Sequence, residues 1–178
     1  MPDHPIYNDI ETVLSDFCRI PKRSIIKHID GCNIPVYGVP LKNMALAYAN
    51  LADEGFMGGK YRKTQKLLMD AMRAHPEMVG GTDRIDTHII RKFKDRLICK
   101  TGAEASHCVG LPGKGMGIAL KIEDGNLRAV GPVILETLLQ TGIISREEAE
   151  ELKDIWNPPT LNHSKVKVGE TRAVFKLK

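Results

Sequence analysis

Residues 96–122, RLICKTGAEASHCVGLPGKGMGIALKI, contain three short apolar runs that decide the fold. The runs cover residues 96–102, 106–111 and 116–122, and the segments AEA and PGKG separate them. Short apolar runs with glycine-bearing connections are typical of an antiparallel meander. We therefore predict three adjacent antiparallel strands. Gly113-Lys114-Gly115 joins two of them, which favours a hairpin turn over a phosphate-binding loop that opens a helix.

Helical spacing of apolar residues marks the segments on both sides of this meander. It predicts helices over residues 6–18, 41–53, 60–74, 86–93 and 127–139 and a helix that ends near Trp156, with a strand over 24–29 and two edge strands within 165–177. Ser145 and Glu148 have the spacing of a capping box. Separate blocks of helices and strands favour an α+β fold, an antiparallel sheet with packed helices, over a β-α-β repeat. No composition shift marks a linker, so we expect residues 1–178 to form a single unit.

The composition is that of a globular protein, with 42% apolar and 27% charged residues. No apolar run approaches the roughly 18 residues of a membrane span, and the first residues lack the features of a secretory signal. We therefore expect a cytoplasmic protein without a membrane partner. Residues 164–178 hold five basic side chains and one acidic one, which accounts for the whole net charge of +4. Because nucleic-acid binders present a basic face across the fold, this tail indicates a solvated hairpin and no nucleic-acid partner.

Lys100-Thr101-Gly102 is the strongest local candidate for chemistry. A strand lysine followed by a hydroxyl residue and a glycine is typical of serine acyl-transfer enzymes, in which the ammonium supports a nearby serine. Such enzymes also carry Ser-x-x-Lys at the start of a helix. Ser24 and Lys27 have this spacing, but the isoleucines around them predict a strand. A solvated strand lysine is the competing interpretation of Lys100.

Cys32 differs from the other three cysteines, which lie in apolar stretches and are expected to be small buried residues. It follows Asp30-Gly31 in a predicted turn. A carboxylate and a thiol at such a corner can bind an amino group or a soft metal ion. A single cysteine is not a metal site, because catalytic zinc needs about three protein ligands. A plain tight turn is therefore the competing interpretation of this segment.

Six stretches, in order along the chain, together resemble one known family, the bacterial type II L-asparaginases of the Rhizobium kind. They extend from about residue 2 to residue 174 and read PDHPI, IDGCNIPVYGVPL, AMRAHPEMVGGTDRIDT, LICKTGAEA, HCVGLPGKGMGIALKI and NHSKVKVGETR. That family is similar in fold to serine β-lactamases and penicillin-binding proteins. The resemblance implies hydrolysis of L-asparagine to L-aspartate and ammonia by a serine that a lysine activates.

The resemblance also implies roles for individual residues. Lys100 would be the strand lysine paired with the catalytic serine, and Asp30 would hold the amino group of the substrate. Cys32 would be one ligand of a zinc ion that two cysteines and a lysine hold. The remaining substrate-binding residues would be Gly102, Ala103, Glu104 and Arg84, the last of which shares its motif with Asp86.

The chain departs from this family in length and at one glycine. Members are about twice as long, and the chain matches their C-terminal half. The serine and the remaining zinc ligands belong to the N-terminal half, and Ala105 replaces the usual glycine after Gly-Ala-Glu. We therefore expect the C-terminal half of an active site, with the missing groups in an N-terminal half. Because a half-fold exposes apolar surface that its other half would cover, we also expect a homo-oligomer or an N-terminal partner. The alternatives are a non-catalytic module that binds a ligand or partner, and a β-lactamase-like acyl transferase that uses Ser24.

Overall fold

The segment quoted above forms a three-stranded antiparallel sheet in the computed structural model, which describes residues 4–178. Its strands are β3 (Ile98–Thr101), β4 (Ser106–Leu111) and β5 (Met116–Lys121), in the order β3-β4-β5. The predicted meander is confirmed. Its second connection is the predicted hairpin turn, in which Gly113 and Gly115 adopt positive φ angles of 70° and 59°. The fold is α+β, as the sequence predicts.

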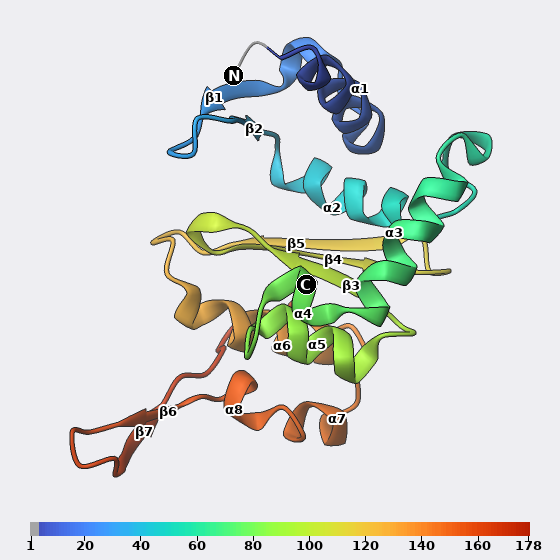
Figure 1. Cartoon of the computed structure of the whole chain (residues 1–178). Coiled ribbons are helices and arrows are strands. Elements are labelled where there is room, and N and C mark those ends of the chain that lie inside the picture. Colours follow the sequence, from blue (N-terminus) through green and yellow to red (C-terminus); the bar gives the residue numbers. More distant parts are fainter. Residues whose placement is uncertain (1–3) are drawn as a thin grey trace.

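Helices cover both faces of this sheet (Figure 1). Helix α2 (Leu41–Leu51) lies on one face, and α5 (Ile85–Phe93) and α6 (Val130–Gln140) lie on the other. The core on the second side is mostly aliphatic, with Phe93 and Trp156 as its aromatic members, and its fully buried side chains include Ile89, Ile90, Leu97, Ile134, Leu135 and Leu138. Because burial of such side chains provides most of the favourable free energy of folding, this three-layer unit is the frame of the molecule.

The other elements surround this unit. On the side of α2 they form a second layer, which lies farther from the sheet than α2 does (Figure 1). That layer contains α1 (Ile6–Cys18) and a hairpin of β1 (Ile26–Ile29) and β2 (Pro35–Gly38). The remaining elements are α3 (Arg62–Ala74), α4 (Pro76–Gly80), α7 (Arg146–Glu150), α8 (Lys153–Trp156), β6 (Pro159–Leu161) and β7 (Lys167–Glu170). Within the described residues, no helix is both long and apolar enough to cross a membrane.

Several predicted boundaries are wrong. The strand expected over residues 24–29 begins at Ile26, because residues 22–24 form a 3₁₀ turn. The helix expected to end near Trp156 is two short helices, α7 and α8, although the predicted capping box at Ser145 is present. Of the two strands expected within 165–177, the structure has one, β7, and its partner β6 lies before that segment, at Pro159–Leu161. Pro159 is tolerated because this short strand lies at the edge of the two-stranded sheet.

Two glycines set the distance between α2 and the sheet. A Cβ atom on Gly117 would lie 2.0 Å from the carbonyl oxygen of Ala45, and one on Gly110 would lie 2.6 Å from that of Tyr48. Both neighbours are helix backbone atoms, which cannot move aside as a flexible side chain can. The absence of a side chain on β4 and β5 at these positions therefore allows the close contact.

We predict that Gly117→Ala lowers the free energy of unfolding by about 3 kcal/mol, because the added methyl group forces α2 away from the sheet. Chemical denaturation of the purified variant measures this loss. Gly31→Ala is the matched control, because a Cβ at Gly31 meets no atom within 4 Å. A loss of less than about 0.5 kcal/mol in Gly117→Ala, the usual range for a surface substitution, would contradict this account of the packing.

Candidate functional site

Lys100 lies at the end of β3, at the border between the sheet and solvent. Its Nζ donates a hydrogen bond to the carbonyl oxygen of Thr101 at 2.5 Å and lies 3.6 Å from Oδ2 of Asp86. Its side chain is 47% exposed. The ammonium is therefore held at its inner side and open to solvent at its outer side, as a group that acts on a bound molecule must be.

Asp86, in the first turn of α5, is the single formally charged residue among the buried residues that the structure describes. Its Oδ2 accepts from the backbone N–H of Thr101 at 2.9 Å, and its Oδ1 accepts from the Thr101 hydroxyl at 2.7 Å. Nε2 of His107, on β4, lies 3.1 Å from Oδ1. A buried carboxylate is costly unless it is hydrogen-bonded, and here donors from two strands satisfy it.

The hydrogen bonds fix the charge of Asp86. Burial alone raises the pKa of this carboxyl group, but the hydrogen bonds from His107 and from the N–H and hydroxyl of Thr101 outweigh it and lower the pKa to about 2. Asp86 is therefore an anion at neutral pH. The buried Asp86 carboxylate, which is negatively charged at neutral pH, thus lies beside the Lys100 ammonium at the end of β3.

The segment after β3 has an unusual backbone. Gly102 donates its N–H to the carbonyl oxygen of Ser106 at 2.8 Å, and a Cβ on Gly102 would lie 2.4 Å from the Ser106 hydroxyl oxygen. Glu104 and Ala105 have left-handed φ angles of 56° and 54°. This conformation suits glycine, which gives a physical reason for the family's usual glycine at the position of Ala105.

Arg84, which the resemblance implies as a substrate-binding residue, shares a cavity with Thr101. Both residues line a cavity of about 260 Å³ at the start of α6. Arg84 is exposed and precedes α5 directly, two residues before the buried Asp86. Lys100, Gly102, Ala103 and Glu104 lie at the end of β3 because they are close in sequence. None of these four residues lines the cavity that Arg84 shares with Thr101.

Asp30 and Cys32 lie elsewhere, at the tip of the β1–β2 hairpin in the second layer (Figure 1). Asp30 Oδ1 accepts from the N–H of Gly31 at 2.7 Å, and the Cys32 thiol lies 3.7 Å from Asp30 Oδ2. Both residues are exposed. The described residues show no hydrogen bond or ion pair between this turn and Lys100–Glu104. The candidate site residues thus form two groups.

Cys32 fits a zinc ion only in part. Among residues 4–178, no group of three metal-ligating side chains includes Cys32, so with Asp30 this turn offers two ligands, fewer than the three of a catalytic zinc site. Among the described residues, a group of three such side chains occurs only at Asp86, Cys99 and His107, whose donor atoms all lie within 4.8 Å of one another.

That second group is better explained as a hydrogen-bonded network than as a metal site. The carboxylate oxygens of Asp86 are already occupied by Thr101 and His107. Burial, and then the charge of Asp86, raise the pKa of the Cys99 thiol well above its ordinary value, so the thiol is neutral in the network that the structure shows. If Nε2 of His107 bound a metal, the ring proton would move to Nδ1, which is buried and has no hydrogen-bond partner. The structure therefore gives no reason to place zinc there.

His107 is the site residue that sequence reasoning missed. Nothing in the neighbourhood of a single histidine on a strand predicts its partner, which is 21 positions away. The sequence around Asp86, the partner of His107, does indicate that a buried pair exists. Asp86 is three and four positions before Ile89 and Ile90, so it lies on the apolar face of its helix, where a carboxylate needs a partner.

Neither Ser-x-x-Lys pair in the chain opens an α-helix. Ser24 ends a 3₁₀ turn and Lys27 lies on β1. Ser164 and Lys167 have the same spacing, but they lie in the turn and second strand of the β6–β7 hairpin. The geometry therefore does not favour Ser24 as the nucleophile of a β-lactamase-like acyl transferase.

Comparison with known protein families gives a match over nearly the whole chain. The model of a family described as L-asparaginase II matches residues 1–173, nearly the whole chain. A search of curated proteins finds no match. The match includes Pro2 and Asp3 of the PDHPI stretch, which lie outside the described residues.

The lowered pKa of Asp86 makes stability depend on pH. Because the pKa is about 2 in the folded chain and about 3.8 when unperturbed, this group stabilises the fold above pH 3.8, and the contribution is lost as the pH falls through 2. We predict that between about pH 5 and pH 2 the free energy of unfolding falls by about 2 kcal/mol more in the wild type than in Asp86→Asn. Urea unfolding at several pH values measures both slopes. If the free energy of unfolding fell equally with pH in both proteins, the lowered pKa of Asp86 would be contradicted.

Proposed function

We propose, because this chain belongs to the L-asparaginase II family, that it takes part in the hydrolysis of L-asparagine to L-aspartate and ammonia. It would be an amidohydrolase of the Rhizobium kind, with a fold similar to the serine β-lactamases, and would provide the C-terminal half of the active site. The observation that carries this proposal is the arrangement at the end of β3. There the half-exposed Lys100 ammonium lies against a buried carboxylate and beside Gly102.

Hydrolysis of a side-chain amide needs a nucleophile, a group that transfers protons and a pocket that holds the amino acid. Lys100 supports the proton-transfer role, because its Nζ is fixed on one side and open on the other. The described residues offer no serine at the start of a helix with a lysine one turn later. We therefore assign the nucleophilic hydroxyl to the complementary half. Its oxygen would attack the amide carbon and form an ester as ammonia leaves with the hydroxyl proton, and water would then hydrolyse the ester to release L-aspartate.

The substrate would be held from several sides. Arg84 is exposed in the cavity beside Thr101, and its guanidinium suits a carboxylate of the amino acid. Gly102, Ala103 and Glu104 would border the pocket, and Gly102 would let the substrate approach the strand. Asp30 would bind the amino group of the substrate. Its exposed position on the hairpin leaves the carboxylate available for this contact.

Cys32 would supply one ligand to a zinc ion, and the complementary half would supply the others. Such an ion would polarise or orient the substrate. The exposed thiol, 3.7 Å from the Asp30 carboxylate, is accessible to a ligand set of this kind. The turn alone has too few ligands to hold such an ion.

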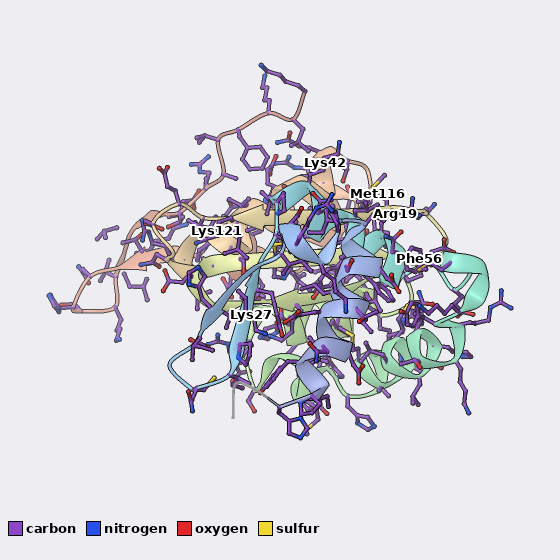
Figure 2. The ribbon with its side chains drawn as sticks, turned by 90° about the horizontal axis from the view of Figure 1, so that it is seen from above. Arg19, Lys27, Lys42, Phe56, Met116 and Lys121 are labelled. Atoms are coloured by element: carbon purple, nitrogen blue, oxygen red, sulfur yellow. The ribbon has the colours of Figure 1, made fainter. Side chains whose placement is uncertain are left out.

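An apolar groove supports a second candidate function, binding of a partner. The groove has a volume of about 620 Å³ between α1, α2 and α3, and its lining includes Ile10, Val13, Leu51 and Leu68. Phe17 packs against Phe56 at its end, with Arg19 over the Phe56 ring (Figure 2). An exposed apolar surface of this kind is typical of a binding site. If the chain forms part of the enzyme, the complementary half would cover this groove. In a homo-oligomer, another copy of the chain would cover it.

The catalytic proposal predicts that Lys100→Ala lowers asparagine hydrolysis at least about 100-fold, because a proton-transfer group is worth about that much. Ammonia release is measured with the chain alone and with a co-expressed N-terminal half that carries the serine. Lys114→Ala is the control, since Lys114 is in the β4–β5 turn at the other end of the strands. If the assembled pair released no ammonia, the proposed function would be wrong.

The groove predicts an effect on association. We expect Leu68→Glu to reduce binding of the complementary half, or self-association, at least about tenfold, because a charge in an apolar interface is left without a partner. Light scattering measures self-association, and titration calorimetry measures binding of the half. Leu67→Glu is the matched control on the same helix, since Leu67 is exposed and does not line the groove. A wild-type chain that stays monomeric at high concentration and binds no half would exclude this role.

A further inference from the structure

We propose that Asp86 is a positioning residue for the reaction, which holds Lys100 in its working place through the end of β3. This inference rests on the proposed function, in which Lys100 transfers protons. Nothing in the family match assigns a role to this carboxylate. The argument starts from the cost of burying it, since a charge that is 2% exposed must be compensated by its surroundings.

Asp86 contacts three consecutive residues of β3. Its carboxylate accepts from the N–H and the hydroxyl of Thr101, lies 3.6 Å from the Lys100 ammonium, and has the Cys99 thiol 3.9 Å away. His107 ties the same carboxylate to β4. A purely structural buried acid needs hydrogen-bond donors, which Thr101 and His107 already provide. The ammonium of Lys100 is an additional partner, attached to the residue that the reaction uses.

The other contact of Lys100 depends on the same carboxylate. Lys100 Nζ donates to the carbonyl oxygen of Thr101, and the N–H and hydroxyl of Thr101 are bound to Asp86. Asp86 thus acts on Lys100 twice, directly by charge and indirectly through the orientation of Thr101. Fixing a half-exposed lysine costs side-chain entropy, and the fixed anion beside Lys100 offsets that cost. A neutral amide at position 86 would keep the shape and lose the charge.

The test uses the full chain in the variant Asp86→Asn and follows the lysine ammonium groups by nuclear magnetic resonance. In the wild type we expect Lys100 Nζ to be more ordered than Nζ of the exposed Lys63. The Lys100 signal is identified as the one that is absent from the spectrum of Lys100→Met. In Asp86→Asn we expect the Lys100 signal to shift and to lose this order. Lys66, which pairs with Asp70 at 2.6 Å, should not change. Asp70→Asn is the matched control and should affect Lys66 alone.

The activity measurement separates this inference from the proposed function. With the assembled pair, Asp86→Asn should lower kcat at least about tenfold and change KM less than about threefold, because positioning acts on the chemical step. A folded Asp86→Asn variant with an unchanged Lys100 signal would overturn the inference. If that variant did not fold, a wild-type Lys100 as mobile as Lys63 would overturn it equally. A wild-type pair without activity but with the expected Lys100 signals would reject the function and leave the positioning intact.

Discussion

The structure around the candidate site depends on one constraint, the burial of the Asp86 charge. A carboxylate in the core is tolerated only when donors replace the water it has lost, and those donors come from β3 and β4. The helix that carries Asp86 is therefore fixed to the sheet by directional bonds as well as by the apolar contacts of Ile89 and Ile90. Directional bonds define one register between helix and strand, whereas apolar contacts alone tolerate small shifts.

On the opposite face of the sheet, close packing rather than hydrogen bonding fixes the helix. There α2 approaches so closely that β4 and β5 carry glycine at the contact points, Gly110 and Gly117. Helix backbone against strand backbone leaves no side chain that can rearrange. The sheet is thus held rigidly from both sides, by hydrogen bonds to α5 and by steric fit to α2. A rigid frame of this kind can keep a side chain at its edge in a reactive position.

The sequence predicts what depends on local patterns, and it fails where distant residues decide. The meander, the glycine hairpin turn and the Ser145 capping box follow from spacing within a few residues, and all three are confirmed. The break between α7 and α8 was not predicted, because apolar periodicity alone continues through it. The pairing of Asp86 with His107 joins residues 21 positions apart, and only the fold brings them together. The role of Arg84 in binding substrate comes from the family resemblance alone and stays a prediction, because no local pattern singles this residue out.

The two groups of candidate residues differ in how firmly they are held, and this difference has a physical meaning. Lys100 is attached to a buried charge and a rigid sheet, whereas Asp30 and Cys32 lie on an exposed two-stranded hairpin. An isolated two-stranded hairpin is only marginally stable by itself. Residues on it can take precise positions only when something else packs against that hairpin. The position of Lys100 is therefore set within this chain. The precise position of Asp30 and Cys32 depends on what packs against the β1–β2 hairpin.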